Sequence, residues 1–437
     1  MQWWSDRSVR VEYVLDSKCK YSRQMSSSKY GVRLWFAPVV IFAWFVAMGP
    51  STVFGSNQLP EANANVLERL EALRPNHAIV LGNAVVTGDL NEVARQFNLH
   101  GTGPQGRDYS IKMVWAHDQR RALFAGANHG LPHRLNDVWA FDLAAMSWIL
   151  LYGPDNPRSY AGLGKDARDV QFQDGVLVTR RGGPAIIAHT WWGLTYDPTV
   201  RRMLFMNTWV TDQDKAISTL GGNPDMRYKG PPLWSFDPVS RRWQLLKTVR
   251  PWPRSPFGGL LEYVPALGGA IWHANNWQMR ASWLYDASTN TWRDLAANAE
   301  SGDFASQAPA PEQVGYHDPH RGLIVVQSKR NTYHFDIALR QWRKVVSAAD
   351  DAAHVPFGHD ARTPFYFDPS SGKGLLIDFR ANALWAYDPD SHTWARLEPE
   401  GDPMPDGKKR LAYLDPERNV FVVLKDTKVW AYRYRGR

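Results

Sequence analysis

The stretch LWAYDPDSHTW, Leu384 to Trp394, decides the fold of this 437-residue chain. The pattern begins with an aromatic residue, any residue, a second aromatic residue and an aspartate. A polar turn follows, and a tryptophan comes nine residues after the first aromatic residue. The alternation before Asp388 indicates a strand with one apolar face, and an aspartate that begins a turn hydrogen-bonds its own backbone. The stretch therefore predicts two antiparallel strands joined by a short turn.

The same pattern recurs along the chain, and VWAYR (Val429 to Arg433) begins a final copy. The other complete copies are VWAFDLAAMSW (Val138 to Trp148), LWSFDPVSRRW (Leu233 to Trp243), SWLYDASTNTW (Ser282 to Trp292) and TYHFDIALRQW (Thr332 to Trp342). A further pair of predicted strands precedes each copy, in most cases around a turn such as Asp368-Pro369. Each unit is therefore expected to form a four-stranded antiparallel blade.

The first aromatic residues of the copies stand at positions 139, 234, 283, 333, 385 and 430. Most intervals are close to the roughly 50 residues of a kelch repeat. Over residues 76–437 the chain resembles the kelch (galactose-oxidase-like) propeller superfamily, although the Gly-Gly doublet that usually ends the second strand is missing. The predicted fold is all-β, a six-bladed kelch-type β-propeller.

The first interval is long, and two insertions at about 153–187 and 208–232 account for it. The segment 76–81 (NHAIVL) resembles the fourth strand of a blade, so it is expected to complete the last blade and close the ring. The runner-up for this role is 95–99 (RQFNL). Before it, residues 56–75 are expected to contain a short amphipathic helix with Val66, Leu67, Leu70 and Leu73 on one face.

Residues 1–55 have the order of an export signal: a basic stretch, an apolar core from Leu34 to Met48, and small residues before a plausible cleavage point after Gly55. Two alternatives stay open, a membrane anchor retained at 34–54 and a true start at Met25 instead of Met1. In either case a secreted or periplasmic location is expected. A contact with the membrane is expected only if the segment is not cleaved.

The net charge of +8 is not evenly spread, since residues 1–55 hold seven basic and three acidic residues. The remainder has no basic run or basic helix, so no nucleic-acid partner is expected. The only cysteine, Cys19, precedes the apolar core. The best-known enzyme type of the kelch superfamily needs a cysteine bonded to a tyrosine, and a processed chain would lack it, which excludes copper-radical chemistry. No cofactor and no metal site are expected.

In such a blade the loop after the second strand and the link to the next blade share one face of the ring. Both long insertions lie on this looped face, which favours it as the binding face. Arginine and asparagine there suit an anionic or hydroxyl-rich ligand, and tryptophan stacks on sugars. The predicted ligand-binding residues are Arg107, Asn128, His129, His189, Trp209, Arg254, His273, Asn275, Asn276, Trp277, Arg362 and Arg410. The opposite face, with its Asp-Pro turns, is expected to be structural.

No G-x-S-x-G elbow, phosphate-binding glycine loop or H-E-x-x-H motif occurs in the sequence. The residues favour an exported, non-catalytic binding propeller for an anionic or hydroxyl-rich glycan, and no catalytic residue is predicted. Two alternatives stay open. One is a sugar-acting enzyme of the mutarotase or epimerase type, with Asp108, Glu262 or His189 available for acid–base work. The other is a scaffold that binds an extracellular protein.

Overall fold

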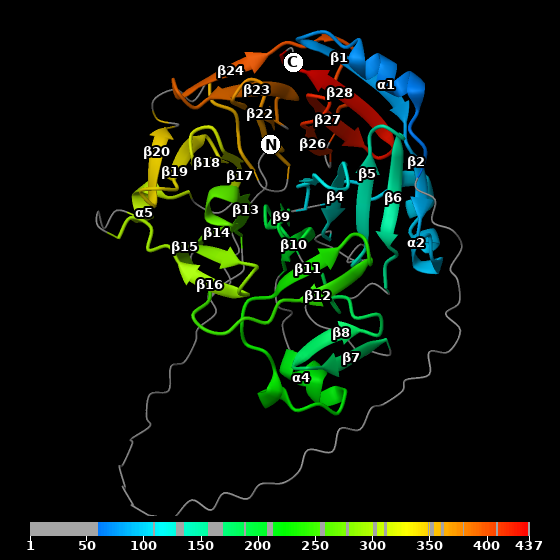
Figure 1. Cartoon of the computed structure of the whole chain (residues 1–437), viewed down its shortest axis with the longest axis vertical. Coiled ribbons are helices and arrows are strands. Elements are labelled where there is room, and N and C mark those ends of the chain that lie inside the picture. The colour runs from blue at the N-terminus through cyan, green and yellow to red at the C-terminus, as the bar shows by residue number, and fades with distance from the viewer. Residues whose placement is uncertain are drawn as a thin grey trace, which may run out of the picture. The chain divides into compact units, whose positions relative to one another are not determined.

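The computed structural model contains six β-sheet blades arranged in a ring, which confirms the predicted β-propeller (Figure 1). The structure describes residues 60–107, 110–127, 135–155, 169–187, 189–207, 213–253, 258–276, 279–299, 304–309, 313–347, 349, 354–359, 362–378, 380–407 and 410–435. The predicted export signal or anchor at 1–55 lies outside these residues. In the described part of the chain, no helix has both the length and the apolarity to cross a membrane.

Each blade contributes one strand to the inner wall of the ring and one to the strand layer behind it. The inner strands are β3 (Val114–Ala116), β9 (Leu194–Asp197), β13 (Leu260–Val264), β17 (Gln313–Asp318), β21 (Phe365–Asp368) and β26 (Leu411–Asp415). The second strands are β4 (Arg121–Ala125), β10 (Arg202–Met206), β14 (Gly269–Asn276), β18 (Leu323–Ser328), β22 (Lys373–Asp378) and β27 (Val420–Lys425). Neighbouring inner strands contact one another around the whole ring.

The repeated sequence pattern forms the two outer strands of each blade. The third strands are β5 (Val138–Asp142), β11 (Leu233–Asp237), β15 (Met279–Asp286), β19 (Asn331–Asp336), β23 (Ala383–Asp388) and β28 (Lys428–Arg433). The fourth strands are β6 (Ser147–Tyr152), β12 (Arg242–Leu245), β16 (Thr291–Asp294), β20 (Gln341–Val346), β24 (Thr393–Leu397) and β1 (His77–Asn83). We number the blades 1 to 6 in this order.

The ring closes as predicted, because β1 pairs antiparallel with β28 and so completes blade 6 with a strand from the start of the fold. His77 lies opposite Arg433 and Val80 lies opposite Trp430. The runner-up segment 95–99 is instead part of two short helices, α2 (Glu92–Gln96) and α3 (Leu99–Thr102). Two strands extend blades at their outer edges, β2 (Val85–Gly88) beside β6 and β25 (Glu400–Gly401) beside β1.

The predicted N-terminal helix is α1 (Ala64–Glu71), capped by the Asn63 side chain, which accepts a hydrogen bond from Val66 N at 3.2 Å. Val66 and Leu70 are buried. Arg69 donates hydrogen bonds from α1 to the carbonyl oxygens of Val80 and Leu81 in the closing strand, at 2.8 and 3.2 Å. The helix therefore packs against the point of ring closure.

The aspartate of each repeat begins the turn between the two outer strands and caps it, as predicted. Asp142 Oδ1 accepts from Ala145 N at 3.1 Å, and Asp286 Oδ1 accepts from Ser288 N at 2.8 Å. Two residues before each repeat tryptophan the chain adopts a positive φ, between 49° and 56°, at Met146, Arg241, Asn290, Arg340 and His392. This left-handed residue turns the chain back into the fourth strand and sends the tryptophan into the blade core.

The two insertions contain most of the irregular structure. The first includes the hairpin of β7 (Val170–Gln173) and β8 (Val176–Thr179), and the second includes α4 (Gln213–Thr219) and the 3-10 turn η1 (Pro224–Met226). Ile217 of α4 packs with Val170 and Leu177 of the hairpin in a small core of its own. Figure 1 shows them together at one edge of the ring. The insertions therefore fold as one module rather than as separate loops.

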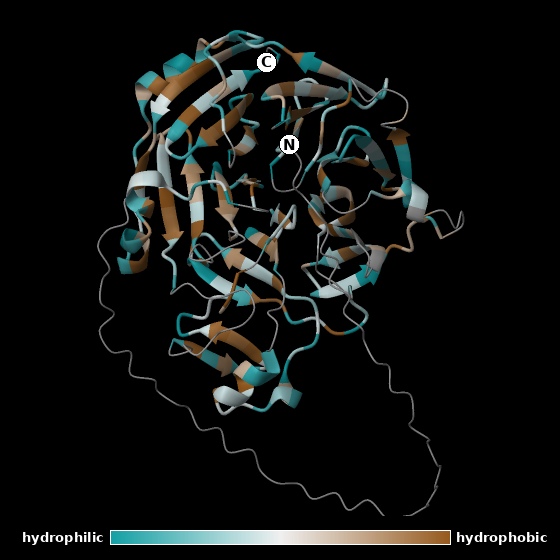
Figure 2. Cartoon of the chain, turned by 180° about the vertical axis from the view of Figure 1, so that it is seen from behind, coloured by the Kyte–Doolittle hydropathy of each residue, from teal (hydrophilic) through white to brown (hydrophobic). Residues whose placement is uncertain are grey.

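The remaining short helices are α5 (Phe304–Gln307) and the 3-10 turn η2 (Pro265–Leu267). Hydrophobic residues form packed layers between neighbouring blades, and polar residues lie at the outer strands and turns (Figure 2). The repeat tryptophans belong to these layers, since Trp148, Trp243, Trp292 and Trp342 are buried and Trp394 is half-buried. Their role is to hold the blades together.

Candidate ligand-binding site

A cavity of about 420 Å³ occupies the centre of the ring, and every blade contributes to its wall. It is lined by Lys112, Met113, Val114, Trp115, His117, Thr195, Tyr196, Pro198, Glu262, Tyr263, Pro265, Gly315, Tyr316, His317, Pro319, Tyr366, Phe367, Pro369, Tyr413, Leu414 and Pro416. The prolines belong to the turns that follow the inner strands. The cavity, which we call the cup, therefore lies on the side of the Asp-Pro turns, the face expected to be structural.

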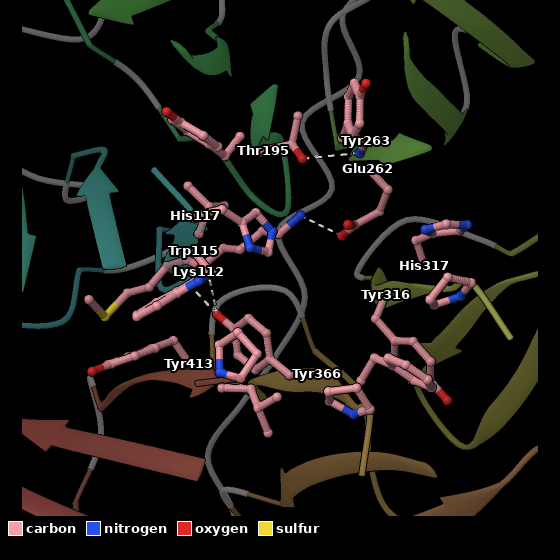
Figure 3. A pocket seen from close by; sticks show the side chains of 18 of the residues that line it. Lys112, Trp115, His117, Thr195, Glu262, Tyr263, Tyr316, His317, Tyr366 and Tyr413 are labelled. Atoms are coloured by element: carbon pink, nitrogen blue, oxygen red, sulfur yellow. Dashed lines mark hydrogen bonds and ion pairs between the residues drawn. The ribbon is translucent and has the colours of Figure 1, made fainter. Parts of the chain in front are cut away.

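The floor of the cup is an ion pair between blades that are not neighbours. Lys112, which precedes β3 of blade 1, places Nζ 2.5 Å from Glu262 Oε1 on β13 of blade 3 and 2.8 Å from the carbonyl oxygen of Leu261 (Figure 3). The exposed fraction of the side chain is 4% for Lys112 and 13% for Glu262. Burial lowers the pKa of the Lys112 ammonium and raises the pKa of the Glu262 carboxyl, and each partner's charge opposes the effect on the other.

Two further side chains cross the channel at the same depth. The indole of Trp192, fully buried, donates from Nε1 to the carbonyl oxygen of Gly315 in blade 4 at 2.6 Å, and the ammonium of Lys112 lies 5.3 Å from its ring centroid. The hydroxyl of Tyr366 in blade 5 accepts from Met113 N at 2.9 Å and donates to Met113 O at 3.1 Å. Each of these contacts connects two blades that are not neighbours.

Aromatic side chains form the wall above this floor. Trp115 and Tyr413, from blades 1 and 6, stack with their ring centroids 6.0 Å apart and their planes 10° apart. Tyr316 and Phe367, from blades 4 and 5, stack with centroids 5.6 Å apart. Trp115, Tyr263 and Phe367 are half-buried, so part of each ring is exposed. Exposed aromatic faces around a cavity suit a ligand that has a ring of its own.

Two histidines, His117 and His317, stand near the rim (Figure 3). Burial lowers the pKa of His317 to about 4, and Asp318 only partly opposes this effect. Burial also lowers the pKa of His117, against the charges of Asp118 and Glu417. Both imidazoles are therefore neutral at pH 7, and the charged lining residues are Lys112 and Glu262, which neutralise each other.

The predicted ligand-binding residues were expected on the other, looped face of the ring. Asn128, His129, Trp209, Arg254 and Trp277 lie outside the described residues. Asn275 and Asn276 end β14, where they pair with Arg280 and Met279 of β15. None of the seven predicted residues that the structure describes lines the cup. A binding role for them stays a prediction.

Arg107 is only 2% exposed and forms a double contact with Asp137, at 2.9 Å from Nη1 to Oδ1 and 2.6 Å from Nη2 to Oδ2. Its guanidinium also donates to the carbonyl oxygen of Gly126. Arg410, 4% exposed, donates to Asn382 Oδ1 and to the carbonyl oxygen of Pro405. In this structure both guanidinium groups therefore fix local chain segments.

The two predicted histidines that the structure describes are also buried. His273 is 0% exposed, packs on Trp342 with ring centroids 4.3 Å apart, and contacts Ser282 Oγ through Nδ1 at 2.9 Å. His189 is 6% exposed and meets Trp191 edge to face. Arg362, by contrast, is exposed. In the described part of the chain, no three His, Cys, Asp or Glu side chains are close enough to hold a metal ion.

The sequence pattern of the inner strands includes the aromatic residues of the cup, but the sequence analysis gave them a structural role in the blades. In five inner strands an aromatic residue occurs two or three positions before the turn proline, as Tyr196, Tyr263, Tyr316, Phe367 and Tyr413. Aromatic residues are expected in any strand core, so this signal does not distinguish a wall from packing. Glu262 was named as a possible acid or base, whereas its partner Lys112 was not foreseen.

No protein-family model matches the sequence, and no curated protein is significantly similar to it. Among solved structures, the chain is similar to an auxiliary nutrient binding protein from Bacteroides ovatus, with 11% identity and a TM-score of 0.44 over 81% of this chain and 76% of the other. It is also similar to TolB from Acinetobacter baumannii, with 11% identity and a TM-score of 0.35 over 69% of this chain. The match spans 56% of the TolB chain. Similarity at this level does not indicate a ligand.

Proposed function

We propose that this protein is an exported, non-catalytic binding propeller of the kelch type that takes a hydroxyl-rich ring molecule, such as the end of a glycan, into the cup. The supporting observation is the central cavity itself, with exposed aromatic rings above a polar floor. A ligand pocket is usually concave and mostly apolar, with a few fixed polar groups. Export rests on the apolar stretch from Leu34 to Met48.

The cup also favours a particular binding geometry. A sugar ring has apolar C–H faces and polar edges, so one face stacks on Trp115 while hydroxyls reach the floor. The described residues that line the cup include no arginine, which is the usual residue for carboxylates and phosphates. The cup therefore supports the hydroxyl-rich ligand class that the sequence suggested more than the anionic class.

Calorimetric titration with short neutral and acidic oligosaccharides tests this function, with thermal unfolding of each variant as a check on the fold. Trp115→Ala is expected to weaken binding by about tenfold or more, as for an aromatic residue at the centre of an interface. Trp252→Ala is the matched control, because Trp252 is also half-buried but lies outside the cup. Equal affinity in the Trp115 variant and its parent contradicts the proposal.

The same titration separates the two faces of the ring. The double substitution Arg254→Ala and Arg362→Ala removes two of the predicted ligand-binding residues of the looped face. Binding at the cup predicts no change in this variant. A loss of binding there, with Trp115→Ala unaffected, moves the site to the looped face, and no binding of any sugar favours the protein-binding scaffold.

A sugar-acting enzyme is the second candidate, and Glu262 favours it. The carboxyl lies at the floor of the cavity and its pKa is raised by burial, a combination found in general acids and bases. Proton NMR of each sugar that binds, with and without the protein, distinguishes the candidates. Interconversion of sugar forms that is lost in Glu262→Gln supports an enzyme, and an unchanged spectrum supports a binder.

A further inference from the structure

The Lys112–Glu262 pair at the floor of the cup offers a donor and an acceptor side by side. An ammonium has three N–H donors, and the structure pairs two of them, with Glu262 Oε1 and the carbonyl oxygen of Leu261. A carboxylate accepts through both oxygens, and the contact with Lys112 uses Oε1. Glu262 also has the indole of Trp192 as a hydrogen-bond neighbour. Both side chains of the pair line the cavity, so the donor and acceptor capacity that remains is next to the space that a ligand would fill.

A hydroxyl group matches this arrangement because it accepts one hydrogen bond and donates another at the same time. The oxygen of the hydroxyl accepts from Lys112 while its hydrogen is donated to Glu262. A carboxylate has no hydrogen to donate and brings a second negative charge towards Glu262. An ammonium has no lone pair and brings a second positive charge towards Lys112.

The net charge of the floor also favours an uncharged ligand over a charged one. Lys112 Nζ and Glu262 Oε1 are 2.5 Å apart and nearly buried, so the floor has no net charge. Burial lowers the pKa values of the two lining histidines, His117 and His317, so both imidazoles are mainly neutral at pH 7. A charged ligand would lose its hydration in the cup without meeting an unmatched opposite charge.

We propose that the Lys112–Glu262 pair is the specificity determinant of the cup and selects uncharged polyhydroxylated rings against their acidic counterparts. This inference rests on the proposed function. It narrows the ligand from anionic or hydroxyl-rich glycans to neutral ones, and it assigns the choice to two named side chains.

The test compares pairs of ligands that differ in one group. The probes are the methyl glycosides of glucose, galactose and mannose and the three corresponding uronates, with affinity measured by saturation-transfer NMR and calorimetry. The parent protein is expected to bind at least one neutral glycoside about tenfold or more tightly than its uronate, since an unmatched charge in a desolvated site is costly. Equal affinity for the two members of each pair overturns the inference.

Glu262→Gln makes the test specific to the pair. It leaves the charge of Lys112 without a partner, so the ratio of neutral to uronate affinity is expected to shift towards the uronate by about tenfold or more. Asp214→Asn is the control, because Asp214 pairs with Arg227 at 2.8 Å in the second insertion, outside the cup, and it is expected to leave the ratio unchanged. An unchanged ratio in Glu262→Gln contradicts the inference.

A second variant covers the case in which Glu262→Gln does not fold. The double substitution Lys112→Met and Glu262→Met removes both charges and is expected to weaken binding of the neutral glycoside without strengthening that of the uronate. A double variant that keeps the full neutral preference contradicts the inference. If neutral glycosides bind and Trp115→Ala weakens them, the proposed function stands even when the pair proves irrelevant. If no probe binds to the parent protein, the proposed function itself fails.

Discussion

The indole Nε1 of Trp192 donates a hydrogen bond to the backbone carbonyl of Gly315 at 2.6 Å, from blade 2 across the channel to blade 4. Trp192 and Gly315 are both buried, so loss of the indole N–H leaves a buried carbonyl oxygen without this donor. A contact between non-neighbouring blades supports the ring in a way that strand pairing within blades does not. It also closes the channel below the cup, together with the Lys112–Glu262 pair.

Trp192→Phe is expected to destabilise the fold by about 1–3 kcal/mol, the cost of a buried acceptor left without its partner. The free energy of unfolding, measured with urea, checks this value. Trp272→Phe is the control, because Trp272 is also fully buried but its indole N–H has no hydrogen-bond partner among the described residues. If both variants lose the same free energy of unfolding, the cause is the smaller ring volume and not the hydrogen bond across the channel.

The buried pair of Lys112 and Glu262 is expected to show strong energetic coupling. Lys112→Met or Glu262→Gln alone leaves one uncompensated charge and is expected to cost about 3–5 kcal/mol, whereas the double variant costs clearly less than the sum. A double-mutant cycle with urea unfolding measures the difference. The exposed pair of Arg120 and Glu417 gives the comparison, with an expected coupling below about 1 kcal/mol. If the losses of unfolding free energy in the two single variants add up to the loss in the double variant, Lys112 and Glu262 are not coupled.

His273 is expected to make stability depend on pH in the acidic range. Burial lowers its pKa from 6.5 to about 3. Between these values the unfolded chain binds a proton that the folded chain does not, so the free energy of unfolding falls as pH falls, and above about pH 6.5 this residue has no effect. One histidine contributes a slope of up to about 1.4 kcal/mol per pH unit.

Urea unfolding between pH 7 and pH 4 tests this slope. His273→Asn removes the titrating ring and is expected to make the dependence shallower. His100→Asn, at an exposed position, is the control and is expected to leave the slope unchanged. If His273→Asn leaves the pH dependence as steep as in the parent, the histidine is not the cause.

Ring closure is expected to be essential for a monomeric fold. Deletion of residues 60–83 removes α1 and β1 and leaves β28 as an open sheet edge, which can pair with another chain. Light scattering after size-exclusion chromatography is expected to show aggregation. Arg69→Ala is the control, because it removes the side-chain bonds from α1 to the closing strand and leaves strand pairing in place. A monomeric deletion variant with cooperative unfolding would contradict this expectation.

The two lining histidines are expected to add little pH dependence to ligand affinity at the cup between about pH 6.5 and pH 8. His317, with a pKa of about 4, stays neutral across this range, and burial also lowers the pKa of His117. Calorimetric titration at several pH values, with the neutral glycoside that binds most tightly, checks this expectation. A sharp loss of affinity near pH 6.5 would indicate an ordinary histidine in contact with the ligand.

The repeated pattern was sufficient to predict the number of blades, the strand order and the closing strand. Each repeat has its own local rules, an aspartate that caps a turn and a tryptophan at a fixed distance, so the fold follows from short-range information. The position of the cup was not predicted from the sequence. Loop length indicated the looped face, whereas the described cavity lies among the short Asp-Pro turns.

The sequence by itself determined the scaffold of this protein, because strand alternation and turn residues act over a few neighbouring positions. Only the tertiary structure decided where the channel is open and which charges meet in it. Lys112 and Glu262 are separated by 150 residues, and Trp192 and Gly315 by 123. These contacts form across the ring, where the partner of a side chain depends on the closure of all six blades and not on any local pattern.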